Sequence, residues 1–203
     1  MQPAGGGSST RLVEVEERRW RAADGSGRVT VIRPPGQRHG PPAGSIAYGP
    51  GGLAGVVPEP MTVEAPIRAT RLEAIRRTGP QAVFRAVADV YAWHHPDSRA
   101  RATLLRLLCN ADGLDGPGAV TGRGPVTDRA GRAGLAVSVD SDHGATRDTV
   151  IVDPGTGLLL AHETVRMRNP AGLAVATPTL VSYTLYLDRG RRAQPGPPRR
   201  QPE

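Results

Sequence analysis

The sequence has few aromatic residues and almost no cysteine. Its 203 residues include one Phe, two Trp and four Tyr, so any core must be built mainly from small aliphatic side chains. The single cysteine, Cys109, excludes an internal disulfide framework. Because it follows Leu107 and Leu108, we expect Cys109 to be buried as a small hydrophobe. No apolar run approaches the roughly 18 residues that a membrane-spanning helix needs.

Lysine is absent, and all 26 basic residues are Arg. This excludes the phosphate-binding loop that requires a Lys. The net charge of +7 is uneven: residues 68–106 hold eight Arg against three acidic residues, 189–203 five against one, and 107–188 six against nine. Nucleic-acid-binding proteins usually combine a basic stripe with stacking aromatics or a recognisable module. We therefore expect no specific nucleic-acid partner, although an Arg-driven polyanion-binding protein stays an alternative.

Glycine and proline divide the chain into regions. Residues 1–10 are predicted to be a flexible Gly/Ser-rich lead, and residues 11–188 a single α+β domain. Within that domain, 34–60 has seven Pro and seven Gly and is predicted to be a long loop without a regular element. The segment 189–203 has almost no apolar residue and is predicted to be a disordered basic tail.

Residues 11–33 predict a β-hairpin. Val13 and Val15 alternate with charged residues on its first arm, and Val29 and Val31 alternate with polar residues on its second. Ala-Asp-Gly-Ser-Gly between the arms supplies turn residues. The period of two is typical of strands that are buried on one face.

Two or three helices follow the long loop. A short helix is predicted over 70–77, and a second opens at Gly79-Pro80, since Pro favours the first helical turn. Pro96 disfavours helical geometry at His95, so the second helix should end there. Asp97 or Ser98 can cap the next helix. The apolar stripes of these two helices are Val83, Val87, Val90 and Tyr91, then Ala100, Leu104, Leu107 and Leu108.

The C-terminal region, 126–188, has alternating apolar residues in segments separated mostly by short turns, which indicates an antiparallel meander. The predicted fold is therefore α+β: a twisted antiparallel β-sheet, formed by the N-terminal hairpin plus the C-terminal meander. Two or three helices cover one face of that sheet, and the other face is partly open.

The segment DPGTG contains the most conspicuous candidate for catalysis. Asp153 follows the apolar run VIV, as a nucleophilic aspartate of a phosphoryl-transfer enzyme follows a buried parallel strand. Such enzymes continue into a helix, whereas here the strand-like GLLLAHETV follows. Asp153, Pro154 and Gly157 are also the residues that a hairpin turn with a bulge requires. We therefore predict a structural turn, with a hydrolase or phosphatase using Asp153 as an alternative.

Histidines supply the remaining candidates. His94, His95 and Asp97 are the best metal-ligand candidates, but neighbouring residues on a helix point about 100° apart and rarely bind one ion. Helix-end and capping roles explain them more simply. His162 alternates with Thr164 and is expected to be solvated, and Asp142-His143 is expected in a surface turn. We predict no catalytic residue, no metal and no cofactor.

Five segments resemble an uncharacterised actinobacterial family of membrane-anchored proteins, typically encoded beside extracytoplasmic-function sigma factors. They are WRAADGSGR (20–28), YGPGGL (48–53), VTDRAGRAGLAVS (126–138), RDTVIVDPGTGLLLAHETV (147–165) and VSYTLYLD (181–188). The DPGTG hairpin among antiparallel strands is also remotely similar to the lipoprotein-carrier and sigma-regulator sheet that holds hydrophobic ligands.

The resemblance implies a location and a role. Members of that family carry a basic segment and a transmembrane helix before an extracytoplasmic domain, and this sequence begins after that position, which predicts either a truncated start or a soluble copy. The function that we expect is a non-catalytic, envelope-associated sensor or ligand-cradling domain, connected with sigma-factor signalling. Its expected partner is a membrane lipid or an envelope protein.

Overall fold

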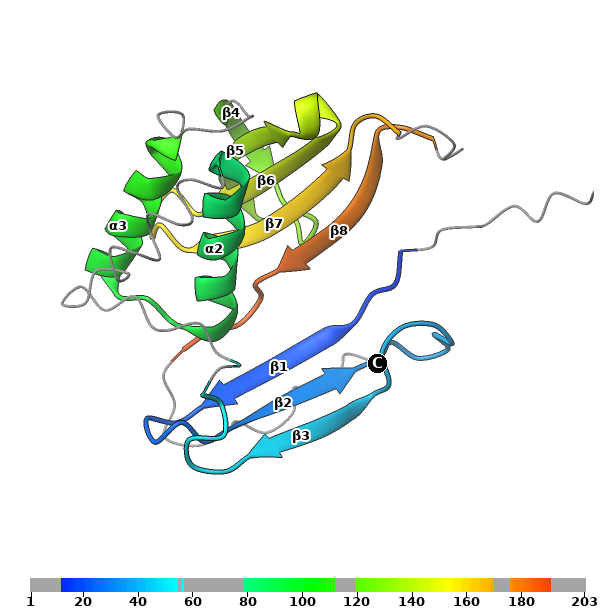
Figure 1. Ribbon diagram of the computed structural model, residues 1–203, viewed down its shortest axis with the longest axis vertical. Helices are drawn as coiled ribbons and strands as arrows, with labels where there is room; N and C mark the ends of the chain where they lie inside the picture. Colours follow the sequence, from blue (N-terminus) through cyan, green and yellow to red (C-terminus); the bar gives the residue numbers. More distant parts are fainter. Residues whose placement is uncertain (1–11, 55, 57–78, 112–119, 170–175, 191–203) are drawn as a thin grey trace, which may run out of the picture. The chain divides into compact units, whose positions relative to one another are not determined.

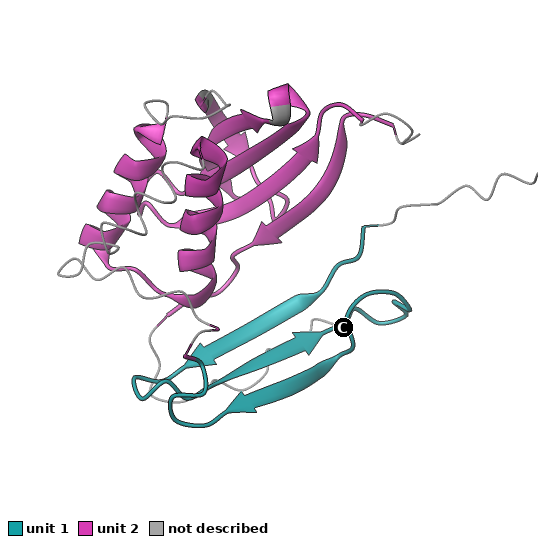
Figure 2. Cartoon of the chain, in the orientation of Figure 1, with its two compact units in different colours: residues 1–53 teal, residues 54–203 magenta. Residues whose placement is uncertain are grey.

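The computed structural model describes residues 12–54, 56, 79–111, 120–169 and 176–190. The chain divides into two compact units, residues 1–53 and residues 54–203 (Figure 2). Both units contain an antiparallel sheet, and the second also contains the described helices (Figure 1). The predicted α+β class with antiparallel sheets is therefore confirmed, although the strands form two sheets instead of one. The helix predicted over 70–77 lies outside the described residues.

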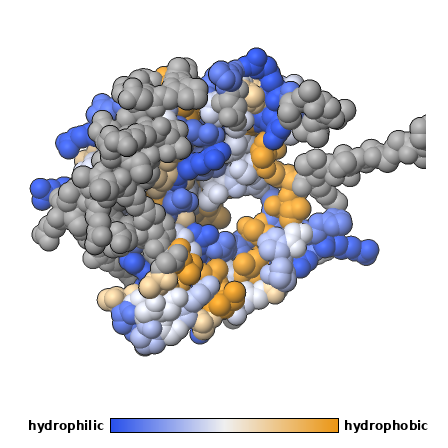
Figure 3. Space-filling view, viewed as in Figure 1, coloured by the Kyte–Doolittle hydropathy of each residue, from blue (hydrophilic) through white to orange (hydrophobic). Residues whose placement is uncertain are grey.

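The first unit is a three-stranded meander of β1 (Glu16–Arg21), β2 (Gly27–Ile32) and β3 (Gly44–Tyr48). The predicted hairpin is β1 and β2, but β1 begins at Glu16, so the prediction that Val13 and Val15 form its first arm was wrong, and Val15 is 40% exposed. Strand β3 lies within 34–60, where our prediction of no regular element was also wrong. Pro and Gly flank that short strand, and its own residues pair with β2. Apolar side chains reach the surface of this unit (Figure 3), where Ile46 is 59% exposed.

Two of the five segments that carry the family resemblance pack against each other in the first unit. The backbone N–H of Gly51 donates to the carbonyl oxygen of Asp24 (2.8 Å), and that of Leu53 donates to Gly25 (3.1 Å). The Leu53 side chain is only 2% exposed, and a Cβ on Gly27 would lie 2.4 Å from its Cδ1. The same Cβ would lie 2.5 Å from the backbone carbonyl oxygen of Trp20, and because a backbone atom cannot move aside as the tip of a side chain can, glycine is required at this position.

The second unit is a five-stranded antiparallel sheet with two helices on one face. Its strands β4 (Val120–Thr127), β5 (Ala133–Ser141), β6 (Thr146–Val152), β7 (Leu159–Arg166) and β8 (Thr179–Leu185) lie side by side in chain order. A short 3-10 turn, Asp142–Gly144, joins β5 to β6 at the surface turn predicted there. The helices are α2 (Pro80–Trp93) and α3 (Ser98–Cys109). No helix in the described part of the chain is long and apolar enough to cross a membrane.

The main core lies between the helices and the sheet face that they cover, which we call the helix face. Both predicted stripes point into it, with Phe84 and Leu104 completely buried against Val139, Val150 and Leu159. Leu107 lies at its border and is half-buried. The prediction that Cys109 is buried was wrong: it is exposed, because the core-facing row runs through Leu104 and Leu108, and the next residue lies about 100° further round the helix.

A second apolar cluster lies on the opposite face, which we call the far face. Side chains alternate along a strand, so Ile151 points away from the helix face on which Val150 and Val152 lie. This far-face cluster consists of Ala136, Ile151, Leu160 and Ala161, with Val126 and Leu185 packed against it. The sheet therefore holds apolar side chains on both of its faces.

The β4–β5 hairpin folds over the far face. Ser138 on β5 and Glu163 on β7 both pair with Thr149 on β6, so these three residues lie in one row across the sheet. Arg129 lies in the turn after β4, beyond the last pair of the β4–β5 hairpin, Thr127 with Ala133. At about 3.3 Å per residue and about 4.8 Å between strands, a flat sheet would separate Arg129 from Glu163 by roughly 20 Å. Their Nε and Oε1 atoms are 2.9 Å apart. The sheet must therefore curl, and the predicted partly open face is partly covered by its own first hairpin.

Candidate functional site

A completely buried carboxylate, Asp148, lies on the helix face near the start of α2. Its side chain is 0% exposed. Its Oδ1 atom accepts a hydrogen bond from the Thr164 hydroxyl (2.7 Å) and lies 3.3 Å from His162 Nε2. Its Oδ2 atom accepts from the Gln81 amide and lies 3.9 Å from a guanidinium nitrogen of Arg85. We call these five residues the Asp148 centre.

The sequence places the five residues together through strand register and helix phase. Asp148 pairs with Thr164, and Val150, the next residue on the same face of β6, pairs with His162, so both β7 side chains share the face of the carboxylate. Because α2 begins at Pro80, Gln81 lies in its first turn. Arg85 follows four residues later on the same side of the helix. The centre thus connects α2 to β6 and β7.

The electrostatics of the Asp148 centre favour a charged carboxylate. Burial alone would raise the pKa of Asp148, but the interactions with His162, Thr164 and Gln81 outweigh burial and hold the pKa below its usual value. The His162 contact is an ion pair when the imidazole is protonated; it is not aligned as a hydrogen bond. The prediction that His162 is solvated was wrong: its side chain is 16% exposed, because the polar row of β7 faces the helix side.

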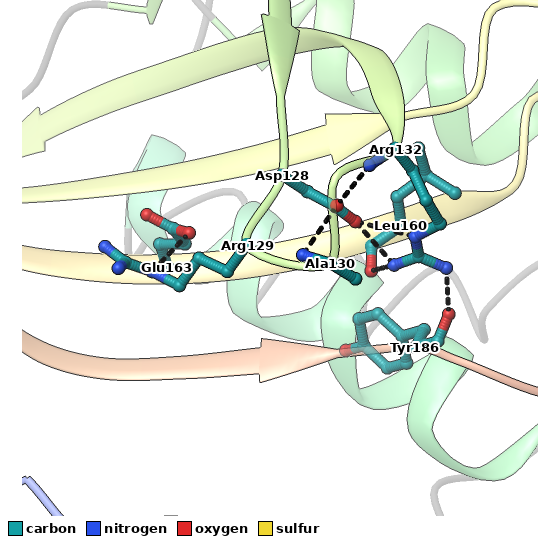
Figure 4. Close-up of polar contacts among 7 residues, drawn as sticks. All are labelled: Asp128, Arg129, Ala130, Arg132, Leu160, Glu163 and Tyr186. Carbon is teal, nitrogen blue, oxygen red and sulfur yellow. Dashed lines mark hydrogen bonds and ion pairs between the residues drawn. The ribbon is translucent and has the colours of Figure 1, made fainter. Parts of the chain in front are cut away.

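A second polar cluster fixes the turn of the β4–β5 hairpin (Figure 4). Asp128 accepts hydrogen bonds from the backbone N–H groups of Ala130 and Arg132, each at 2.9 Å, and from Arg132 Nε at 2.8 Å. Arg132 also donates to the backbone carbonyls of Leu160 (2.8 Å) and Tyr186 (2.7 Å). One side chain therefore connects the hairpin turn to β7 and to the residue that follows β8.

Arg129 adds an outer contact to this cluster. Its guanidinium pairs with Glu163 and lies over the ring of Tyr183, 5.4 Å from the centroid. We call Asp128, Arg129, Arg132 and Glu163, with the two carbonyls that Arg132 binds, the arginine clasp. Burial would raise the pKa of Asp128, but the hydrogen bonds and the charge of Arg132, together with the Ala130 N–H, hold it below its usual value.

Arg189, the first residue of the predicted tail, packs against the second unit. Its guanidinium lies 3.9 Å from the ring centroid of Tyr186 and 4.9 Å from that of Tyr91. Burial lowers the pKa of Arg189 to about 10, with the two tyrosines opposing the shift and Arg132 adding to it. The predicted disorder is therefore wrong for this residue, and 191–203 lies outside the described residues.

Asp153 occupies the turn between β6 and β7 that the sequence indicates. Its carboxylate accepts from the backbone N–H of Gly155 (2.8 Å) and the Thr156 hydroxyl (2.9 Å), and these bonds hold its pKa below the usual value. Gly157 has a φ of 69°, and its carbonyl accepts from the Tyr91 hydroxyl at 2.9 Å. Pro154 is exposed in the same turn. An antiparallel strand follows Asp153, so the helical crossover of a phosphoryl-transfer site is not present there.

The three metal-ligand candidates lie at helix ends. His94 caps the C-terminus of α2, where its backbone N–H donates to Val90, and His95 follows it. The Asp97 carboxylate caps α3 by accepting from the backbone N–H of Ala100 at 2.8 Å. Among the described residues, no group of three or more His, Cys, Asp or Glu side chains could hold a metal ion.

Sequence reasoning missed Asp148 and Asp128. A signal for Asp148 was available, since it shares its strand face with Val150 and Val152 and therefore points toward the core. The buried role of Asp128 depends on Arg132 reaching β7, which no local pattern encodes. Comparison with protein-family models, curated proteins and solved structures finds no match for this chain.

Proposed function

We propose that this protein is a non-catalytic, envelope-associated sensor domain that holds an apolar ligand, such as a lipid acyl chain, against the far face of its five-stranded sheet. The observation that carries this proposal is the far-face cluster, an apolar surface separate from the main core. The arginine clasp holds the turn of the β4–β5 hairpin over this surface, while β5 stays paired with β6. Opening of the hairpin would expose apolar side chains of β6 and β7 to a ligand.

Two further observations support this location of the binding surface. The helix face is occupied by bulky buried side chains, including Phe84 and Leu104, so a ligand there would have to displace the main core. The carboxylates of Asp128, Asp148 and Asp153 each accept several hydrogen bonds from their own surroundings. Such carboxylates suit structural roles better than attack on a substrate.

The envelope location and the connection with sigma-factor signalling are supported by the resemblance to membrane-anchored proteins. A sensor of this kind would couple ligand occupancy to the position of the β4–β5 hairpin. A ligand that binds only when the arginine clasp is open would shift the hairpin from its closed to its open form.

A fluorescent long-chain fatty acid, titrated into the full chain, tests the proposal. We expect saturable binding that Val126→Asp weakens at least about tenfold, because a charge would enter the apolar surface beside Ile151 and Leu160. Ile46→Asp is the matched control: it removes an exposed apolar side chain in the other unit and should leave the affinity unchanged. Absence of binding by the unaltered chain, or equal binding by the two variants, would contradict the proposal.

A further inference from the structure

Two tyrosines that are far apart in the sequence form a fixed pair of rings in the second unit. Tyr91 lies in the last turn of α2, and Tyr186 follows β8. Their ring centroids are 6.5 Å apart, and the ring planes are tilted by 56°. The Tyr91 hydroxyl donates to the carbonyl of Gly157 and the Tyr186 hydroxyl to that of Ala88, each at 2.9 Å. Because both hydroxyls are used in this way, the rings are held in place and offer their faces to a third group.

The surroundings of these two rings favour a positive charge. The face of an aromatic ring is electron-rich and attracts cations within about 6 Å of the centroid. The C-terminal turn of α2, which carries Tyr91, adds the negative end of a helix dipole. A cation already lies there: the guanidinium of Arg189 is 3.9 Å from the Tyr186 centroid and 4.9 Å from that of Tyr91.

Arg189 is a poor occupant of this position. Its Nη1 and Nη2 atoms are buried and have no hydrogen-bond partner in the part of the chain that the structure describes. Buried donors without acceptors are costly. Burial also lowers the pKa of Arg189 to about 10, and the charge of Arg132 acts in the same direction. The two rings therefore attract the charge of Arg189 but leave its N–H groups unsatisfied.

We propose that Tyr91 and Tyr186 form a binding site for a quaternary ammonium group, such as that of choline, and that Arg189 occupies the site when the ligand is absent. A quaternary ammonium group is a cation without N–H groups, so it gains the attraction of the rings and leaves no donor unsatisfied. Arg189 follows the last strand of the sheet, so it can leave the rings without breaking the pairing of β7 with β8. The group comes either from a free cation or from a lipid head group.

Titration of choline chloride into the full chain at constant ionic strength, followed by NMR, tests the site. We expect a Kd on the order of 10 mM, because choline must displace Arg189. The compound 3,3-dimethylbutanol has the shape of choline without its charge and should bind at least about tenfold more weakly. Absence of choline binding up to about 100 mM, or equal binding of the two compounds, overturns the proposal.

Variants test the role of Arg189. Arg189→Ala should strengthen choline binding at least about tenfold, because it removes the competing cation. Arg129→Ala is the matched control: its guanidinium lies over a single ring, that of Tyr183, and its loss should leave the affinity unchanged. Equal affinities of Arg189→Ala and the unaltered chain, or an equal gain in Arg129→Ala, contradicts the proposal.

Vesicles distinguish the two sources of the group. Phosphatidylcholine vesicles are compared with vesicles rich in phosphatidylethanolamine, whose ammonium keeps its N–H groups. Co-sedimentation of Arg189→Ala with the first but not the second identifies a lipid head group as the ligand, and choline binding without vesicle binding identifies a free cation. Equal co-sedimentation with both kinds of vesicle contradicts recognition of the quaternary ammonium group.

Discussion

Asp148 shows how one buried charge can connect two elements of a fold. A carboxylate without exposed surface is costly unless its oxygens are paired, and here a hydroxyl, an amide, an imidazole and a guanidinium surround it. Because two of these groups come from α2 and two from β7, the charge is compensated only when helix and sheet are docked. The same residue would therefore be a source of instability in any partly docked state.

Replacing Asp148 by Asn should lower the free energy of unfolding by about 2 kcal/mol at neutral pH. The pKa of Asp148 is depressed in the folded chain, so its contribution is present above the ordinary Asp pKa of about 4 and is lost as pH falls through the folded value. Urea denaturation at several pH values should show the difference between the two proteins shrinking below about pH 4. Asp89→Asn, at an exposed site of α2, should have little effect at any pH; a similar loss there would contradict a special role for Asp148.

Gly134 is required by close packing on the far face. A Cβ built there would lie 2.6 Å from Ile151 Cγ2 and 2.9 Å from the carbonyl oxygen of Val152. Gly134→Ala should therefore destabilise the chain by about 1–3 kcal/mol, measured by thermal or chemical denaturation. Gly124 lies on β4 with open space around its Cβ position, so Gly124→Ala serves as the control and should be nearly neutral. Equal stabilities of the two variants would mean that the far face is looser than the structure indicates.

At the scale of elements, the arginine clasp determines whether the β4–β5 hairpin stays folded over the sheet. Arg132→Ala would remove the guanidinium from the buried Asp128 carboxylate, which would keep only its two backbone N–H donors, and from the carbonyls of Leu160 and Tyr186. We expect a loss of about 2–4 kcal/mol. Arg129→Ala removes an ion pair whose Arg is about half exposed, and should cost less than about 1 kcal/mol. Denaturation curves that rank the two variants in the opposite order would contradict this division of roles.

The turn at Asp153 is the element on which the distinction between enzyme and structural domain depends. Asp153→Ala should lower the free energy of unfolding by about 1 kcal/mol, because Gly155 N–H and the Thr156 hydroxyl lose their acceptor. The measurement is chemical denaturation, together with an assay for phosphate-ester hydrolysis. Unchanged stability combined with the loss of a measurable hydrolysis rate would favour the phosphatase alternative.

At the scale of the whole molecule, local sequence patterns predicted elements better than their assembly. The Gly79-Pro80 start of α2, the Asp97 cap of α3 and the meander after residue 126 all depend on neighbours in sequence, and all are present in the structure. Strand β3 was missed, because flanking Pro and Gly obscured a five-residue strand that is defined by its pairing with β2. Strand β4 was missed for a similar reason, because most of its residues precede 126 and include Gly and Pro, and its pairing with β5 defines it.

The candidate site was less predictable for the same reason. Asp148 and His162 are 14 positions apart, and their contact depends on the β6–β7 register and on a helix that docks above both. The alternation of side chains along β7 assigned His162 to the polar face of that strand, which is correct. That polar face lies beneath α2 instead of in solvent. The position of Arg132 depends on the curl of the complete sheet, which no single strand pattern contains.

Amide hydrogen exchange of the full chain, with and without a saturating long-chain fatty acid, tests the central claim that the far face binds an apolar ligand under the β4–β5 hairpin. We expect ligand to increase protection along β6 and β7, whose apolar side chains it covers, and to lower protection in the turn between β4 and β5 as the clasp opens, with little change in α2 and α3. Protection confined to the two helices, or an exchange pattern unaffected by the fatty acid, would contradict this account.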